Sequence, residues 1–193
     1  PMLNHILLGI FVLVGPAATM AEVSLLPLFS DNMILQQLTN NAVWGMASPG
    51  EKVTVAGSWG AKETTTADQN GDWKVMLPTP KYGTGFSLNI TGENKIHIRN
   101  LAVGEVWLCA GQSNMGWALR MTFGGEEEAA SADAPDLRLF RSSREHWHQP
   151  LKQSRDRLKH WSPCTPQSAG TTSAVSYYFG KKLHEALGIP IGI

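Results

Sequence analysis

The chain has 193 residues with 16 basic and 16 acidic side chains, and its hydrophobic content of 42% is ordinary for a globular protein. Balanced charge excludes the basic excess that binding to the phosphates of a nucleic acid requires. A chain of this length can form one large domain or two small ones, each with a buried core.

The first 21 residues differ in composition from the rest. Residues 6–14 (ILLGIFVLV) are apolar and are followed by small residues up to Ala21. This stretch is too short to span a bilayer, which takes about 20 residues. It is typical of the hydrophobic region of a signal peptide, with cleavage after Ala21, although no Lys or Arg precedes it. We therefore expect an exported protein (secreted, periplasmic or lumenal) with no stable membrane span. A buried strand or helix is the alternative.

From residue 22 to about residue 101, short strand patterns alternate with turn signals. In Lys52-Val-Thr-Val-Ala-Gly57 the apolar side chains recur every second residue, as a half-buried strand requires. Asn70-Gly71 predicts a hairpin with a type I′ turn, because both central positions of that turn need positive φ. Many short strands without a helical period predict an all-β sandwich over residues 22–101. The expected strands cover residues 32–37, 41–46, 52–57, 73–77, 86–90 and 95–99.

The pattern changes in the second half of the chain. Residues 103–110 (VGEVWLCA) are mostly apolar, which is typical of a strand buried on both faces. We expect helix or loop over residues 114–130 and a second strand over residues 136–140. The polar segment 142–168 carries three prolines and is expected to be a long irregular connection.

A helix is expected near the end of the chain. Thr172 or Ser173 is its N-cap, and Gly188 with Pro190 stops it. Residues 189–193 then begin another strand. The apolar side chains expected to lie on one face of this helix are Ala174, Val175, Tyr178, Phe179, Leu183 and Leu187.

The succession of strand, helix and strand predicts a parallel α/β domain over residues 102–193. Only about three strands and one helix are expected there, and the chain ends inside a strand. A sheet that stops at such a point has an open edge. We therefore expect an incomplete α/β domain, preceded by the β-sandwich, in a fragment of a longer protein.

Ser113 is the candidate nucleophile. It follows the expected strand and Gly111, at the end of a strand where open α/β sheets bind ligands. A turn from a strand into a helix would expose the hydroxyl and direct backbone N–H groups toward an oxyanion. The Gly-x-Ser-x-Gly elbow of the α/β-hydrolases does not fit, because Met115 occupies the position of the second glycine. By spacing alone, the same residues are equally typical of a helix N-cap.

A resemblance to a known family favours catalysis. Residues 103–115 (VGEVWLCAGQSNM) resemble the nucleophile block of the sialate O-acetylesterase family, a branch of the SGNH hydrolases with a flavodoxin-like α/β fold. Further blocks resemble the family in the same order. Those at 29–37, 43–45, 49–53 and 71–74 resemble its N-terminal β-domain, and those at 173–180 and 187–192 its next helix and strand.

The resemblance implies that Ser113 attacks an acetyl carbonyl and that its own backbone N–H is one oxyanion donor. It also implies that a later Gly and Asn complete the oxyanion hole and that an Asp-x-x-His motif supplies the base. These later elements are not in this sequence, so the chain by itself is expected to be inactive. The substrate implied is acetylated sialic acid or another acetylated glycan.

Three neighbours of Ser113 are candidates for support or substrate binding. Gln112 and Asn114 match family positions, and Gln112 is expected to support the site by hydrogen bonding. Trp117 is a candidate sugar contact, because aromatic rings stack on the faces of sugars. No metal or cofactor is expected.

The histidines and cysteines have simpler interpretations. His146 and His148 could form a metal pair or a base, but no third ligand lies nearby, so a surface position is expected. None of the other histidines, among them His97, His160 and His184, is assigned to catalysis. Cys109 and Cys164 are expected to be two buried thiols, with a disulfide as the alternative in an oxidising compartment.

Two other functions stay open at this point. The β-sandwich could be a non-catalytic carbohydrate-binding domain followed by an inert α/β remnant. The protein could also be an acetylxylan-esterase-like enzyme.

Overall fold

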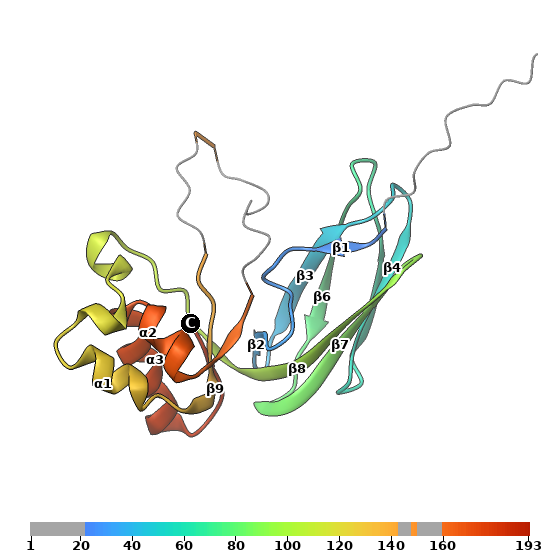
Figure 1. The fold of residues 1–193 in the computed structure, drawn as a ribbon. Coiled ribbons are helices and arrows are strands. Elements are labelled where there is room, and N and C mark those ends of the chain that lie inside the picture. Colours follow the sequence, from blue (N-terminus) through green and yellow to red (C-terminus); the bar gives the residue numbers. More distant parts are fainter. Residues whose placement is uncertain (1–21, 143–147, 150–159) are drawn as a thin grey trace, which may run out of the picture.

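The computed structural model describes residues 22–142, 148–149 and 160–193 (Figure 1). The signal peptide expected at residues 1–21 lies outside the described residues. Strands fill one part of the molecule and helices gather in the other, and the long strand β8 (Lys95–Val106) runs between the two parts.

The strand-rich part contains two sheets that share one core. The smaller sheet is antiparallel and consists of β1 (Ser24–Leu25), β3 (Asn40–Met46) and β6 (Asp72–Pro78), in the order β1-β3-β6. The larger sheet includes β4 (Lys52–Gly57), β5 (Lys62–Thr66), β7 (Gly83–Thr91) and β8, and β2 (Ile34–Gln36) pairs with β8 in parallel. Buried side chains from both sheets pack in one cluster that includes Val43, Leu77, Val55 and Ile90.

The expected strands of this part are all present, but one local prediction is wrong and one strand was not predicted. Asn70-Gly71 does not close a type I′ hairpin. That turn needs positive φ at both residues, and here Gly71 has positive φ but Asn70 does not. The turn instead links β5 to β6, which lie in different sheets, and Asp68 stabilises it by accepting hydrogen bonds from the backbone N–H groups of Asn70 and Asp72. Strand β5 was not expected, because its polar sequence lacks alternation.

The helix-rich part continues the larger sheet with parallel strands. Strand β11 (Ile191–Gly192) lies between β8 and β9 (Ala134–Leu139) and is parallel to both, whereas β10 (Ser162–Cys164) is antiparallel to β9. Gly104 allows this arrangement, because a Cβ there would collide with the carbonyl oxygen of Pro190. The helices are η1 (Ser113–Gly116), η2 (Leu119–Met121), α1 (Gly125–Ala130), α2 (Pro166–Thr171) and α3 (Ala174–Leu187). The prediction of parallel strands connected through helices is confirmed.

Helix α3 has the caps expected from its sequence. The Ser173 hydroxyl accepts from the N–H of Ser176, and Gly188 ends the helix in the left-handed conformation with φ of 65°. The predicted buried face is wrong at Val175, Tyr178, Phe179 and Leu187, which are exposed, and is confirmed at Ala174 and Leu183. The fully buried residues of the helix are Ala174, Ser176, Tyr177 and Gly180.

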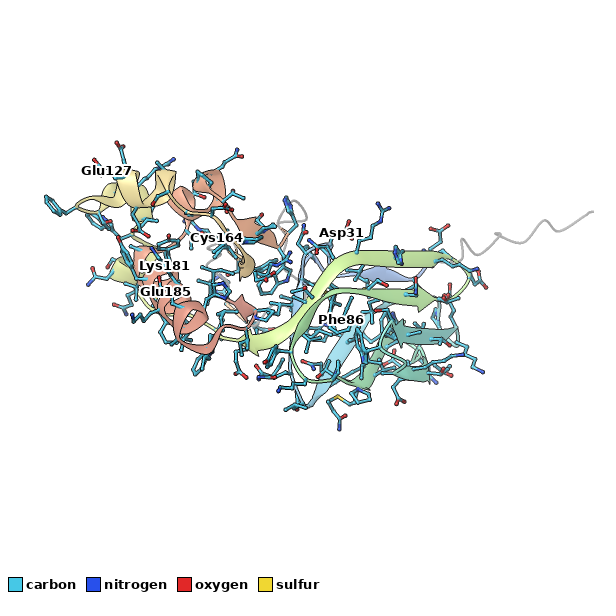
Figure 2. All side chains as sticks on the ribbon, turned by 90° about the horizontal axis from the view of Figure 1, so that it is seen from below. Asp31, Phe86, Glu127, Cys164, Lys181 and Glu185 are labelled. Carbon is cyan, nitrogen blue, oxygen red and sulfur yellow. The ribbon has the colours of Figure 1, made fainter. Side chains whose placement is uncertain are left out.

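A hydrogen-bonded group fastens α3 to α1. The Tyr177 hydroxyl donates to Glu128 at 2.8 Å, and Lys181 forms an ion pair with the same carboxylate. The hydrogen bond from Lys181 is the main cause that lowers the pKa of Glu128 below its ordinary value. In Figure 2, Cys164 and Lys181 lie in the helical part, and Asp31 and Phe86 lie in the strand-rich part.

Two predicted features of the connections need correction. The strands expected at 95–99 and 103–110 are one continuous strand, β8, which ends at Val106. The segment 142–168, expected to be irregular, contains β10 and the first turn of α2 among its described residues. The signal for α2 was present, because Thr165 and Ser168 form a capping box and Pro166 occupies the first helical position.

The predicted boundary between residues 101 and 102 falls within β8. The two parts also share core contacts, because Trp161 packs in the core cluster of the strand-rich part and its indole N–H donates to the carbonyl of Leu28 at 2.9 Å. An independent β-sandwich domain therefore stays a prediction. None of the helices in the described part of the chain combines the length and the apolar character that crossing a bilayer takes.

Candidate functional site

The turn that carries Ser113 lies beyond the end of β8. After Val106 the chain runs irregularly to Gln112, and Ser113 begins the 3₁₀ helix η1. Ser113 and its neighbours Gln112 and Asn114 are exposed. The serine does not begin an α-helix, so its surroundings contain a single 3₁₀ turn of four residues rather than the dipole of a long helix.

A cavity of about 490 Å³, called the main cavity below, lies beside this turn. Its walls come from the segments that follow the parallel strands β8, β9 and β11, together with the beginning of α3. Gln112 and Met115 of the serine turn contribute to the wall, although Ser113 itself does not. The turn therefore borders a hollow at the carboxyl ends of parallel strands, where open α/β sheets bind ligands.

The start of α3 holds the serine turn in place. The hydroxyls of Ser173 and Ser176 both donate to the sulfur of Met115, at 3.4 Å each. Beyond the turn, the N–H of Leu119 donates to the carbonyl of Thr172, and the N–H of Ala174 donates to the carbonyl of Trp117. The orientation of η1 thus depends on α3, which lies sixty residues further along the sequence.

The residues expected to support Ser113 take different positions. Gln112 lines the main cavity, and its side chain makes no hydrogen bond with the described residues. Asn114 is exposed, and its backbone carbonyl accepts from the N–H of Trp117. Trp117 is 51% exposed, donates its indole N–H to the carbonyl of Met121 and does not line the main cavity. Their proposed roles stay predictions.

Trp107 is an aromatic side chain of the cavity that the sequence interpretation missed. It lines the main cavity, is 45% exposed and packs edge to face on Phe179 with the ring centroids 5.3 Å apart. Its position within the block that resembles the nucleophile segment was the signal that could have identified it. The partly exposed Trp107 ring offers an aromatic surface to the main cavity.

His97 and His184 make hydrogen bonds away from the serine. His97 is exposed on β8 and bonds to Asn89, as expected for the solvent face of a strand. The ring of His184 bonds to the carbonyl of Ile189 at the end of α3. Within the described ranges, no hydrogen bond reaches the Ser113 hydroxyl, and no group of His, Cys, Asp or Glu could hold a metal ion. His148 is exposed, and His146 lies outside the described residues.

The two cysteines are free thiols, but only one is buried as expected. Cys164 is 1% exposed, and burial raises the pKa of its thiol to about 11. Cys109 is half-buried and lines the main cavity, so the prediction of two buried thiols is wrong for this residue. It follows β8, which ends four residues earlier than expected, and the chain between Val106 and Ser113 therefore faces the cavity.

Arg141 lies where the main cavity meets a second cavity of about 620 Å³. The second cavity is lined mostly by hydroxyl-bearing and amide side chains, and both cavities include Arg141 and Thr172 in their walls. The guanidinium donates to the carbonyl of Thr171 at 3.0 Å. Arg141 was not singled out from the sequence, because it sits at the edge of a polar segment that carries no periodic pattern.

No family model matches the chain, whereas individual proteins do. Sialate O-acetylesterases of Mus musculus and Homo sapiens are each 30% identical to it over 183 and 185 residues, which cover 86% and 85% of this chain. The same matches cover 34% and 35% of those two relatives. The crystal structure of a carbohydrate acetylesterase from Xanthomonas citri superimposes with a TM-score of 0.83 at 35% identity, over 89% of this chain and 39% of that one. The chain thus spans about a third of the length of the curated relatives it matches.

Proposed function

Because the chain is homologous to the sialate O-acetylesterases over most of its own length, we propose that it is part of an enzyme that hydrolyses acetyl esters of carbohydrates. One observation carries the proposal. The turn that carries the exposed Ser113 borders a cavity at the carboxyl ends of parallel strands, in a chain that resembles part of a carbohydrate acetylesterase in fold. A nucleophile needs this combination of exposure and an adjoining space for its substrate.

Ser113 acts as the nucleophile in the proposed reaction. Its Oγ forms a bond to the acetyl carbonyl carbon, the bond from that carbon to the sugar oxygen breaks, and the sugar leaves as an alcohol. Water then hydrolyses the acetyl-serine and releases acetate. The backbone N–H of Ser113 is one donor to the oxyanion that forms in each step. The base that accepts the serine proton is expected in the Asp-x-x-His motif that the resemblance implies, and none of the described residues bonds to the Ser113 hydroxyl.

The substrate is an acetylated glycan, with acetylated sialic acid as the preferred candidate. The names of the relatives from mouse and human support sialic acid, and the relative from Xanthomonas citri supports carbohydrates more generally. Trp107 and Trp117 expose the aromatic surface that stacking on sugar rings uses. Export by the segment 1–21 would bring the enzyme to glycans outside the cytoplasm.

The decisive experiment replaces Ser113 in the complete protein. Ser113→Ala is expected to lower the turnover of p-nitrophenyl acetate and of O-acetylated sialic acid by about three orders of magnitude or more, because the nucleophile is lost. Release of acetate or p-nitrophenol measures the effect. Residues 22–193 expressed alone are expected to give no turnover, because they do not contain the Asp-x-x-His motif in which the resemblance places the base.

Ser131→Ala is the matched control for this experiment. Ser131 is an exposed serine of the same part of the chain, at the end of α1, and its hydroxyl bonds only to the carbonyl of Glu128 among the described residues. The variant should keep full turnover. If Ser113→Ala kept full turnover as well, the assignment of the nucleophile would be refuted.

A further inference from the structure

Arg141 differs from all other described residues in the wall of the main cavity. The wall consists of apolar side chains, glycines, hydroxyls and one amide, and Arg141 is the only charged side chain that the described residues contribute to it. Within this wall the guanidinium is therefore the only group that offers a full positive charge to a ligand. An acidic ligand in the main cavity would meet it.

The guanidinium is held in place but leaves most of its donors available. Arg141 follows β9 by two residues, and one of its Nη atoms donates to the carbonyl of Thr171 at the end of α2. No described carboxylate lies within ion-pair distance of it. Because a guanidinium carries five N–H donors, a single bond to a carbonyl fixes its position without using up its capacity.

Arg138, three residues earlier, shows what a structural arginine looks like in this fold. It is 3% exposed, pairs with Asp136 at 3.8 Å and contacts the side-chain oxygens of Asn32 and Asn100 at 3.5 Å. Its charge is matched inside the protein and it lines neither of the two cavities. Arg141 has neither the burial nor the acidic partner, so packing does not account for its charge.

The start of α3 also borders the main cavity, but it offers few donors to an anion. The N–H of Ala174 is bonded to the carbonyl of Trp117, and the N–H of Ser176 to the hydroxyl of Ser173. Both are among the groups that bind anions at free helix N-termini. Among the described side chains of the wall, Arg141 is therefore the one that can form an ion pair with a negative charge in the main cavity.

We propose that Arg141 is a specificity-determining residue that binds the carboxylate of an acidic acetylated sugar. This inference rests on the proposed function, since it concerns the substrate of the same site. A planar guanidinium forms two parallel hydrogen bonds with a carboxylate, which a neutral sugar cannot replace. The enzyme would thereby prefer acetylated sialic or uronic acids to acetylated neutral sugars.

The test compares an acidic substrate with its neutral counterpart in the complete protein. For O-acetylated sialic acid, Arg141→Gln is expected to lower kcat/KM about 10- to 100-fold, mainly through KM, because a charge-assisted pair is lost. For the carboxyl methyl ester of the same sugar, and for p-nitrophenyl acetate, the variant should equal the wild type. Arg141→Lys keeps the positive charge but lacks the planar guanidinium. Its kcat/KM for the acid should lie between those of the wild type and of Arg141→Gln.

Arg120→Gln is the matched control, since it removes one positive charge from η2, a helix whose residues do not line the main cavity. Arg120→Gln should leave kcat/KM unchanged for O-acetylated sialic acid and for its methyl ester. An equal loss on the acid and on its methyl ester in Arg141→Gln would overturn the proposal, because it would indicate a structural defect. An unchanged preference for the acid would overturn it too.

Binding to an inactive variant separates this proposal from the proposed function. Calorimetry with Ser113→Ala should show that the acid binds about 10- to 100-fold more tightly than its methyl ester, and that adding Arg141→Gln removes the difference. That outcome would support Arg141 even if Ser113 were not the nucleophile. Equal affinities for the two ligands in Ser113→Ala would refute Arg141 while leaving the esterase proposal intact.

Discussion

Burial controls the acid–base chemistry of Cys164 at the scale of a single residue. Its thiol is almost completely enclosed in the core of the helical part, where a thiolate would lose its hydration. The pKa of the thiol therefore rises to about 11. An unfolded chain has no such protection, and its cysteine ionises near pH 8.5 to 9.

The free energy of unfolding should therefore decline in alkaline solution. Because the folded pKa of Cys164 is above the unfolded pKa, the stabilising difference is complete below about pH 8.5 and is lost progressively toward pH 11, by about 2 to 3 kcal/mol. Urea unfolding at several pH values between 8 and 10.5 measures the slope. Cys164→Ala should make the decline of the free energy of unfolding with pH less steep, whereas Cys109→Ala should leave it unchanged. Equal slopes in the wild type and both variants would contradict the prediction.

The residues of the site differ in how far the sequence could identify them. The position of Ser113 after a strand could be predicted, because its block is contiguous in the chain, whereas its role as the nucleophile stays a prediction. The positions of Arg141 and Trp107 in the cavity wall could not be predicted, because they depend on which strand ends meet around the cavity. Contacts between β8, β9 and β11 decide that, and no short stretch of sequence contains all three strands.

At the scale of elements, Ser173 connects the stability of α3 with the geometry of the serine turn. Its hydroxyl caps the helix by accepting from the N–H of Ser176, and it donates to the sulfur of Met115. Ser173→Ala is expected to lower the free energy of unfolding by about 1 kcal/mol, the usual cost of a lost N-cap. The same variant should lower kcat in the complete protein, because Met115 of η1 loses one of the two hydroxyl hydrogen bonds to its sulfur.

Thr165→Ala is the matched control for this prediction. Thr165 caps α2 with the same kind of bond and contacts neither Met115 nor the serine turn. Its replacement should cost similar stability, measured by urea unfolding, and leave kcat unchanged. A parallel fall of kcat in both variants would show that general destabilisation, and not the position of η1, is responsible.

The sequence predicted elements well where one face is buried and poorly where none is. Strand β4 has the expected bounds because its alternate side chains are buried. Strand β5 was missed because it lies at the edge of its sheet and is almost entirely exposed. In α3 the apolar residues are spread around much of the helix, so the pattern could not identify the packed face. Gly180 decides it, since the absence of a Cβ there lets the helix approach Leu137 and Ile193.

At the scale of the whole molecule, Trp161 joins the two parts. It belongs to the chain segment before β10, yet it packs in the core of the strand-rich part and lies against Phe140 with ring centroids 5.3 Å apart. We expect Trp161→Ala to lower the free energy of unfolding by about 3 to 5 kcal/mol. Both parts should still unfold in one transition. Circular dichroism and tryptophan fluorescence, recorded on the same sample, measure this transition.

Trp117→Ala is the control for the loss of a large aromatic side chain. Trp117 is half-exposed, so its replacement should cost about 1 kcal/mol or less. A similarly small loss in Trp161→Ala would contradict the coupling between the parts. Separate transitions in the unaltered protein would instead favour the independent β-domain that the sequence predicted.

The continuity of β8 also ties the position of the serine turn to the number of residues in the strand. Successive side chains of a strand point to opposite faces, so inserting one residue between Leu101 and Val106 would reverse the facing of everything that follows. Inserting two residues would restore the facing and move the turn outward by about 7 Å. Insertions and deletions in this strand during evolution should therefore involve an even number of residues or be absorbed by a β-bulge. In the irregular stretch after Val106, insertions of odd and even length should be equally tolerated.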